Sequence, residues 1–345
     1  MTIIYFIFVL LVTIMIHEFG HFLFAKKAGI YVYEFSLGMG PKLYSFNRKN
    51  DETTYSIRLF PIGGYVSMAG EDIEADRDIP FEKTMQAKTW WQRFLTITAG
   101  VLFNFLLALI LLFVIALING APTMTPRISY VEEDSPSAIA GLQAGDKIRA
   151  IDNTKLSTVD RFLLEFQVRI GDTISLKIES KDGTSKTVQI KPEKIVKDEK
   201  TSYSYGFALD NSAKHGIWES IKYAFLKTGS LMEQMCLILG YLFSGKLSLN
   251  SLSGPVGIFN VVGESARAGF LSIVYLIAYL CINVGFINII PFPAFDGGRL
   301  LFLIIEKIKG KPVEPKLENT IHAVGFVILM LLMVVITFND IIRLF

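Results

Sequence analysis

Two histidines and a glutamate lie within an apolar stretch near the start of the chain, in the sequence TIMIHEFGHFLFA. On a helix, His17 and His21 are four residues apart, which places both imidazoles on one face where they can bind the same ion. Glu18 lies beside them, placed to accept a proton from an attacking water. An ionisable side chain at membrane depth is costly unless it is paired or coordinated. The spacing is the HExxH pattern and predicts a catalytic zinc site.

A third zinc ligand must come from elsewhere, because a catalytic zinc ion takes three protein ligands and keeps one open position. The best candidate is Asp296, in the stretch NVGFINIIPFPAFDGGRLLF, at the end of a later apolar segment. Pro291 and Pro293 would break that helix and let the chain turn. If both helices cross the membrane in the same direction, Asp296 lies at the depth of the histidines, in the cytosolic half. The alternative is that these polar groups only hydrogen-bond neighbouring helices.

The composition is that of a membrane protein. Of 345 residues, 51% are hydrophobic and 19% are charged, and the mean hydropathy is +0.44. A soluble domain of this length would carry more charge. The formal net charge of +2 gives no reason to expect a nucleic-acid partner. Cys236 and Cys281 lie in apolar surroundings without ligand spacing, which argues against a disulfide framework and a cysteine metal site.

Four apolar stretches are long enough to cross about 30 Å of hydrocarbon as helices, and they lie within residues 1–25, 94–119, 270–296 and 320–345. The first has no basic segment before it and no small-residue cleavage site, which favours a retained helix over a signal peptide. Basic residues follow the first stretch and precede the second and fourth. The positive-inside rule therefore predicts that the N and C termini both lie outside. We expect an α-helical polytopic membrane protein.

The segments between these stretches differ in pattern. Residues 26–93 alternate aromatic or branched residues with polar ones and contain Gly and Pro, which predicts a β-rich, membrane-associated loop in the cytosol. Residues 297–319 form a second cytosolic segment. Outside the membrane, residues 120–195 have period-two runs, and residues 196–269 are apolar with scattered charges. The latter pattern predicts amphipathic helices along the membrane surface.

Residues 120–195 contain the stretch SPSAIAGLQAGDKIRAIDN, which resembles a PDZ domain of the kind attached to bacterial proteases. Phe162, Phe166 and Ile170, at spacing four, suit one amphipathic helix among the strands. PDZ domains bind peptides by adding a strand to an open sheet edge. The sequence leaves two interpretations open: a domain that binds a peptide ligand, and a shield that binds nothing and blocks folded proteins.

The chain as a whole resembles the site-2 protease family of intramembrane metalloproteases, in its bacterial regulator-of-sigma-E protease branch. The family signatures HExxH and NxxPxPxxDG match at residues 17–21 and 288–297, with lesser matches in GMGPKL and LSGPVGI. The resemblance implies that His17, His21 and Asp296 bind zinc and that Glu18 is the general base. It also implies substrate-binding roles for Asn283 and Asn288, although these amides could equally bond neighbouring helices. Asn104, in the second stretch, is assigned to packing or to bonding between helices.

The resemblance further implies an intramembrane zinc endopeptidase in the bacterial plasma membrane. Its expected substrates are single-span membrane proteins already trimmed outside, such as anti-sigma factors and remnant signal peptides. Two other functions use the same ligands: a peptide-binding membrane scaffold with a structural metal, and a metal-ion transporter. Three ligands with an intact glutamate favour catalysis over a scaffold, because structural zinc is closed by four ligands. The lack of further intramembrane carboxylates and histidines argues against an ion path.

Overall fold

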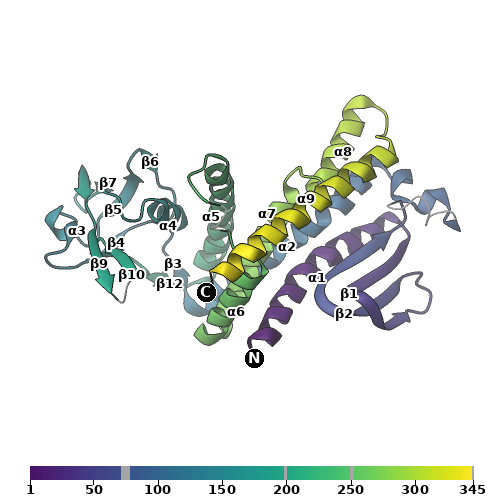
Figure 1. Cartoon of the computed structure of the whole chain (residues 1–345), viewed down its shortest axis with the longest axis horizontal. Helices are drawn as coiled ribbons and strands as arrows, with labels where there is room; N and C mark the ends of the chain where they lie inside the picture. The colour runs from purple at the N-terminus through teal and green to yellow at the C-terminus, as the bar shows by residue number, and fades with distance from the viewer. Residues whose placement is uncertain (71–77, 198–199, 249–251, 344–345) are drawn as a thin grey trace. The chain divides into compact units, whose positions relative to one another are not determined.

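The computed structural model describes residues 1–70, 78–197, 200–248 and 252–343 (Figure 1). Its contacts divide the chain into two compact units. The helical unit comprises Met1–Leu111 and Leu249–Phe345, and the β-rich unit comprises Leu112–Ser248. The chain enters the β-rich unit within the helix α2 (Trp90–Asn119).

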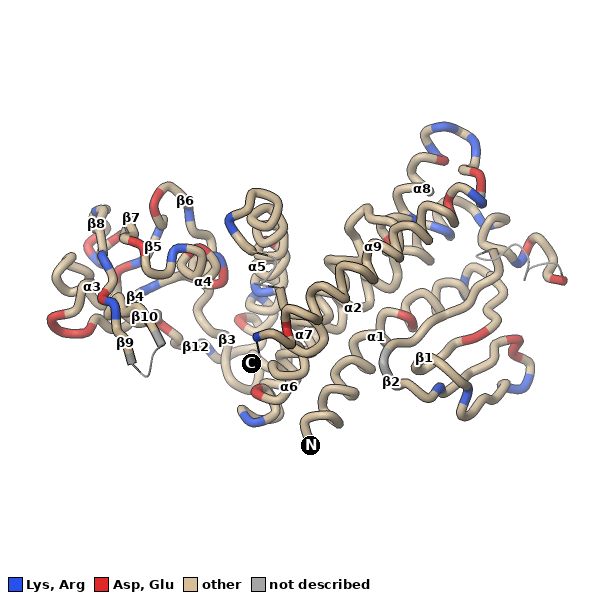
Figure 2. The backbone as a smooth tube through the Cα atoms, in the orientation of Figure 1, with Lys and Arg blue, Asp and Glu red and all other residues tan. Residues whose placement is uncertain are grey.

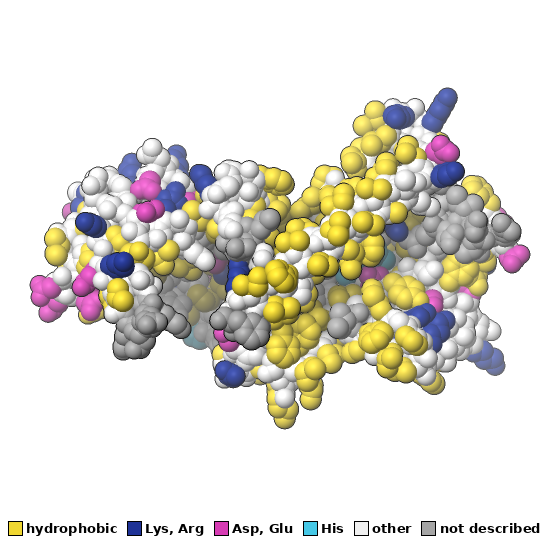
Figure 3. Space-filling model, in the orientation of Figure 1, with side chains coloured by type: hydrophobic (Ala, Val, Ile, Leu, Met, Phe, Trp, Pro, Cys, Tyr) yellow, Lys and Arg dark blue, Asp and Glu magenta, His cyan; other side chains and the backbone are white. Residues whose placement is uncertain are grey.

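The helical unit contains four helices that could cross a membrane by length and composition, counted over the described residues. Their many exposed apolar side chains suit contact with lipid, and Figure 3 shows such side chains covering α9. Lys and Arg gather instead at the turn between α8 and α9 (Figure 2). Each of the four predicted apolar stretches is therefore confirmed as such a helix. The helices of this unit are α1 (Thr2–Ala28), the start of α2, α6 (Pro255–Ala268), α7 (Phe270–Ile289), α8 (Asp296–Lys309) and α9 (Pro315–Ile342).

The third apolar stretch ends earlier than the predicted span over 270–296. Helix α7 ends at Ile289, residues 290–295 form a turn, and Asp296 is the first residue of the next helix, α8. Pro291 and Pro293 explain the break, since neither can donate the backbone hydrogen bond of a helix interior. Ala294 in the same turn has a positive φ of 82°. The turn expected from the two prolines therefore carries the chain to Asp296.

Helices α1 and α2 approach each other closely at Gly20. A Cβ atom built on Gly20 would lie 2.4 Å from the carbonyl oxygen of Ala99 on α2, so only glycine fits there. Contacts through small residues are a common way for membrane helices to pack without a hydrophobic driving force. This close approach lets side chains of α1 reach the backbone of α2.

The β-rich character predicted for residues 26–93 is confirmed by two long paired strands, β1 (Val32–Asn47) and β2 (Thr54–Met68). Phe35 pairs with both Val66 and Tyr55. The first part of β1 therefore lies between the two ends of β2. Strand β2 lies against α1, where a Cβ atom on Gly64 would be 3.7 Å from the Cγ atom of Glu18. The hairpin is thereby placed beside the HEFGH segment.

The β-rich unit is built around a four-stranded sheet of order β6-β5-β7-β8. Its core includes Phe162, Leu176 and Ile190, all fully buried. The helix predicted within residues 158–170 is confirmed as α4. The strands are β3 (Ala121–Pro122), β4 (Ile128–Val131), β5 (Lys147–Ile151), β6 (Thr154–Lys155), β7 (Ile174–Glu179), β8 (Ser185–Ile190), β9 (Glu193–Lys197), β10 (Lys200–Ser204), β11 (Phe207–Leu209) and β12 (Ala213–Lys214), and the helices are α3 (Pro136–Ile139), α4 (Val159–Val168) and α5 (Ile217–Phe243).

The structure differs from the sequence expectation at the start of the region predicted as helical, 196–269. Strands continue to Lys214, β11 pairs with β4, and Tyr205 belongs to the core of the sheet domain. Helix α5 follows, and two of its charged residues pair with α4: Lys227 with the buried Asp160 at 2.6 Å, and Glu233 with Arg161. Pairing of the helix's charges with the sheet domain, rather than with water, satisfies groups that would otherwise be costly to bury.

Candidate metal centre

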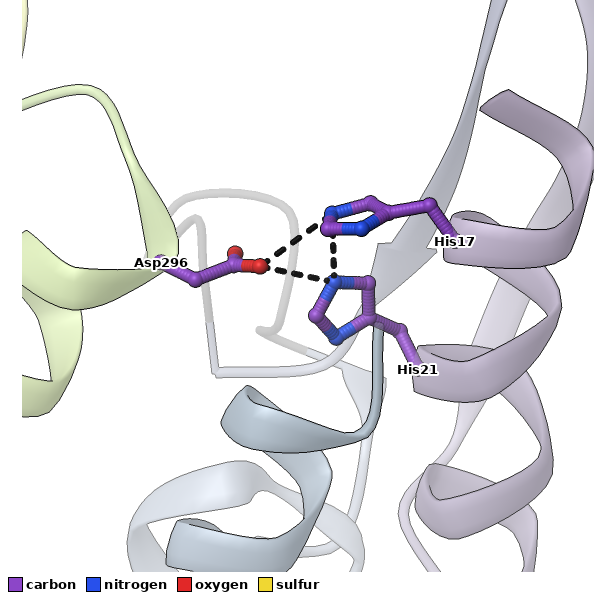
Figure 4. Close-up of side chains that lie close together, drawn as sticks. All are labelled: His17, His21 and Asp296. Carbon is purple, nitrogen blue, oxygen red and sulfur yellow. Dashed lines mark hydrogen bonds and ion pairs between the residues drawn. The ribbon is translucent and has the colours of Figure 1, made fainter. Parts of the chain in front are cut away.

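Three polar side chains that are far apart in sequence meet in the helical unit (Figure 4). His17 and His21 lie one turn apart on α1, and Asp296 reaches them from the start of α8. The Nε2 atoms of His17 and His21 are 3.2 Å apart. Each lies close to the Asp296 Oδ2 atom, at 3.1 Å from His17 and 3.2 Å from His21. The three atoms form a nearly equilateral triangle.

This triangle suits a shared cation better than a set of hydrogen bonds. In the part of the chain that the structure describes, the buried Oδ2 atom of Asp296 has no hydrogen-bond partner, although two ring nitrogens lie near it. For tetrahedral zinc with ligand bonds of 2.0–2.1 Å, two ligand atoms are expected about 3.3 Å apart. The observed separations of 3.1–3.2 Å are close to that value. The donor set of two imidazoles and one carboxylate is also one that zinc accepts.

Helix α2 supplies a partner for each histidine on the ring nitrogen away from the triangle. The Nδ1 atom of His21 lies 2.8 Å from the carbonyl oxygen of Thr96. Because a carbonyl only accepts, this Nδ1 carries a proton, which leaves Nε2 of the neutral ring free to bind a metal. The Nδ1 atom of His17 lies 3.3 Å from Nδ2 of Asn104. Between these two, a Cβ atom on Gly100 would lie 2.3 Å from Nε2 of His21.

These α2 residues are the part of the site that the sequence analysis missed. Thr96 and Gly100 were not singled out, and Asn104 was assigned to packing or helix bonding; it does bond a neighbouring helix, at His17. The three occur at intervals of four residues, which places them on one face of α2. A small or polar residue every fourth position in an otherwise apolar stretch was the available signal, but ordinary helix packing gives the same pattern.

A cavity of about 320 Å³ opens beside the three side chains. Glu18 lines this cavity and is partly exposed, next to Gly64 of β2. Asn288, on α7, also lines it, whereas Asn283 is absent from its described lining. One wall comes from β2 through Tyr65 and its neighbours. The predicted base and one of the two predicted substrate-binding amides therefore share a cavity with the histidines and Asp296.

The β1–β2 hairpin beside the cavity carries its own part-buried network of charged side chains. The carboxylate of Glu34 accepts hydrogen bonds from Arg58 at 2.9 Å and from Tyr65 at 2.9 Å. Burial alone would raise the pKa of Glu34, but hydrogen bonds, including those from Arg58 and Tyr65, lower it below its usual value. The Lys26 ammonium likewise lowers the pKa of Asp51, in the turn between the strands. Both carboxylates are therefore held ionised, and they fix the hairpin beside the site.

Comparison with known proteins finds similarity to one peptidase family and to zinc metalloproteases. The model of peptidase family M50 matches residues 5–332. The zinc metalloprotease RasP of Bacillus licheniformis is 32% identical over 422 aligned positions, covering 100% of this chain and 99% of the relative. RasP of Geobacillus kaustophilus is 33% identical, covering 100% of this chain and 98% of the relative. A solved structure, the PDZ domain of an SdrC-like protein from Listeria innocua, covers 26% of this chain and 99% of that chain at 23% identity, with a TM-score of 0.22.

Proposed function

Because this chain belongs to peptidase family M50, the site-2 protease family, we propose that His17, His21 and Asp296 hold its zinc ion and that Glu18 is its general base. The chain is a zinc metalloprotease and a multi-pass protein of the plasma membrane. The observation that carries the residue assignment is the triangle of Nε2, Nε2 and the unpartnered Oδ2, open to a cavity that Glu18 also lines.

The zinc ion, when bound, supplies a Lewis acid that polarises the scissile carbonyl and makes a water molecule more acidic. Glu18 accepts the proton of the attacking water and passes it to the leaving amine. His21 is held in one orientation by the Thr96 carbonyl, so its Nε2 stays directed at the centre of the triangle. The chain's own part is thus to fix three ligands and to place one carboxylate beside them.

The proposed substrates are membrane-spanning segments of single-span proteins that have already been trimmed outside, with anti-sigma factors and remnant signal peptides as examples. The cavity lies among helices that are apolar enough to cross a membrane, which supports a substrate of that kind. A spanning helix hides its carbonyl groups in its own hydrogen bonds, so it must unwind locally before cleavage. The edge of β2 offers strand addition to the unwound segment.

The two asparagines of α7 complete this proposal. Asn288 lines the cavity and would bond the extended substrate backbone with its amide. Asn283 lies nearly one and a half turns earlier on the same helix and is proposed as a second polar contact for the substrate. Substitution of each by leucine should raise the KM for a peptide substrate if it contacts the backbone, with a larger effect at Asn288.

The proposed topology places both termini outside, the hairpin and α8 in the cytosol, and the β-rich unit outside. The basic residues at the end of α1, at the end of α8 and in the first turn of α9 support this orientation. In this arrangement a PDZ-like domain at 120–195 would meet the outer part of a substrate before its spanning segment is cut. Its proposed role is either to exclude untrimmed proteins or to bind a peptide ligand.

The test is cleavage of a single-span reporter by the full chain in liposomes, with zinc content measured on the same samples. We expect the wild-type protein to cut and a chelator to stop it. Glu18→Gln should keep its zinc and lose activity by about 10²–10⁴-fold, the usual contribution of a general base. Cleavage at the wild-type rate by zinc-loaded Glu18→Gln would refute the assignment of Glu18.

Zinc binding by each ligand variant tests the other three residues. His17→Ala, His21→Ala and Asp296→Ala should each lose stoichiometric zinc. Asn283→Leu, which lies on a helix of the same unit and outside the described cavity lining, should retain it. Full zinc occupancy in any of the three ligand variants would remove that residue from the site.

A further inference from the structure

Asn104 is a fully buried amide whose two ends have different surroundings. Its side chain is 0% exposed in the middle of α2. The Nδ2 atom lies 3.3 Å from Nδ1 of His17. The Oδ1 atom is buried and has no hydrogen-bond partner among the described residues. An unpartnered acceptor in an apolar interior is costly, so its presence in this position calls for a physical reason.

The orientation of this amide decides which nitrogen of His17 carries the proton. With Nδ2 directed at Nδ1, as in this structure, Nδ1 accepts and the proton of the neutral ring lies on Nε2. That Nε2 proton then points towards His21, whose Nε2 atom lies 3.2 Å away. In this tautomer His17 cannot bind a metal through Nε2. Binding requires the proton on Nδ1, and Nδ1–H requires an acceptor.

Rotation of the amide by 180° provides that acceptor within the same volume. The oxygen and the NH2 group of an asparagine are nearly equal in size, so the exchange leaves the packing around the side chain unchanged. After it, Oδ1 faces Nδ1–H of His17 and the unpartnered oxygen is satisfied. We propose that Asn104 is the positioning residue of His17, and that its Oδ1 accepts from His17 Nδ1–H when Nε2 binds zinc.

Helix α2 thereby supplies one acceptor for each histidine. Thr96 supplies a backbone carbonyl to His21, and Asn104 supplies a side-chain oxygen to His17. Gly100, halfway between them, has no side chain and leaves room for both rings. Because Thr96 acts through its backbone, its contribution survives substitution of its side chain. The contribution of Asn104 depends on its side chain and can be tested by mutation.

A simple packing role makes a different prediction. A hydrogen bond between membrane helices contributes a modest stabilisation, whichever residue donates. In that case any residue that fills the space would serve. An acceptor role instead requires an oxygen facing Nδ1. Aspartate preserves that oxygen and leucine preserves only the volume, so the two substitutions separate the alternatives.

The experiment measures zinc affinity of the full chain in detergent by competition with a chelator, and the visible absorption of the Co²⁺-substituted protein. We expect Asn104→Leu to bind zinc about 10–100-fold more weakly and to shift the Co²⁺ bands, as losses of such outer partners do. Asn104→Asp should bind zinc at least as tightly as the wild type. Thr98→Val is the matched control, because the Thr98 hydroxyl donates to the Phe94 carbonyl of its own helix, at 2.8 Å, and to no ring of the triangle.

Each result bears on the proposal. It is overturned if Asn104→Leu matches the wild type in affinity and Co²⁺ spectrum, or if the leucine and aspartate variants lose zinc equally. Asn104→Ala replaces the leucine variant should the latter fail to fold. The inference rests on the proposed zinc site, and the two can fail separately. If His17→Ala binds zinc like the wild type, the site assignment is wrong. If His17→Ala loses zinc but Asn104→Leu binds it like the wild type, only the positioning role is wrong.

Discussion

At the scale of single residues, Gly100 is the position where α2 tolerates no side chain. A Cβ atom there would lie 2.3 Å from Nε2 of His21 and 2.9 Å from Nδ1 of His17. The atoms that would have to move are the rings that form the candidate metal centre. A methyl group at this position therefore acts on the site directly, whereas elsewhere a helical glycine-to-alanine change favours the helix by about 1 kcal/mol.

We expect Gly100→Ala to displace both imidazoles and to lower zinc affinity by at least about tenfold, in line with the effect of misplacing ligands. The matched control is Gly229→Ala on α5, where an added Cβ atom would meet nothing within 4 Å. Chelator competition on both variants is the measurement. Equal zinc affinities for the two variants would show that the rings adapt to the methyl group.

The sequence alone singles out four residues that the structure places at one cavity, but not the residues around them. His17, Glu18, His21 and Asp296 stand out because ionisable groups in apolar stretches are rare and their spacing has a chemical meaning. Thr96 contributes a backbone carbonyl, which every residue has, and Gly100 contributes the absence of a side chain. Neither contribution can be distinguished from helix packing until the facing residue on α1 is known.

At the scale of elements, α9 packs against the 290–295 turn that precedes Asp296. The backbone N–H of Ala294 donates to Nδ1 of His322 on α9, at 3.1 Å. A Cβ atom on Gly325, also on α9, would lie 2.3 Å from Cβ and 2.7 Å from the carbonyl oxygen of Pro293. Helix and turn therefore meet at van der Waals distance, and the turn has little freedom to move towards α9.

We expect Gly325→Ala to push the 290–295 turn away from α9, because the clash involves backbone atoms that cannot rotate aside. Overpacking of this kind costs about 1–3 kcal/mol. The expected result is a lower temperature of thermal unfolding together with weaker zinc binding, since Asp296 follows the turn directly. Gly240→Ala, with open space around the added methyl group, is the control. Weaker folding with unchanged zinc affinity would show that the turn does not set the position of Asp296.

The β1–β2 hairpin should lose stability in acid. The pKa values of Glu34 and Asp51 are lowered in the folded protein, so their ionised forms favour the fold. The sign follows from linkage: this stabilisation is present above the unfolded pKa values of about 4 and is lost as the pH falls below them. Hydrogen exchange of the β1 and β2 amides, corrected for intrinsic rates, should therefore accelerate between pH 5 and about pH 3.

The variant Glu34→Gln isolates one part of this effect. It removes the carboxylate that Arg58 and Tyr65 bond, so its hairpin should exchange faster at neutral pH and change less on acidification. The same acid response in wild type and variant would assign the pH dependence to other groups.

The elements themselves were predictable to different degrees. Long apolar helices follow from hydropathy alone, and the β-rich segment follows from alternation. The strands β11 and β12 were missed because they pair with β4 and β3, which come much earlier in the chain. Short strands held by such distant partners carry little pattern of their own. Two prolines predicted the early end of α7. They did not predict that a new helix begins at Asp296.

At the scale of the whole molecule, the sheet domain is inserted between α2 and α5, and its first and last strands pair with each other. Its first strand, β3, pairs with its last, β12, with Ala121 opposite Lys214. Entry and exit of the domain are therefore adjacent, and residues 121–214 can be replaced by a short flexible linker without separating α2 from α5. A shorter deletion ending at 195 would leave Tyr205 and β11 without the core that they pack into.

This excision decides between the two roles proposed for the domain. If it excludes untrimmed proteins, the excised protein should cut reporters that still carry a folded external domain, which the wild-type protein should leave intact. Trimmed reporters should be cut at similar rates by both, because His17, His21 and Asp296 all lie in the helical unit. If the domain instead binds a peptide that promotes cleavage, excision should slow the cutting of trimmed reporters and still leave the untrimmed ones uncut. Zinc content of the excised protein is the control, because a loss of zinc would explain slow cutting without any role for the domain.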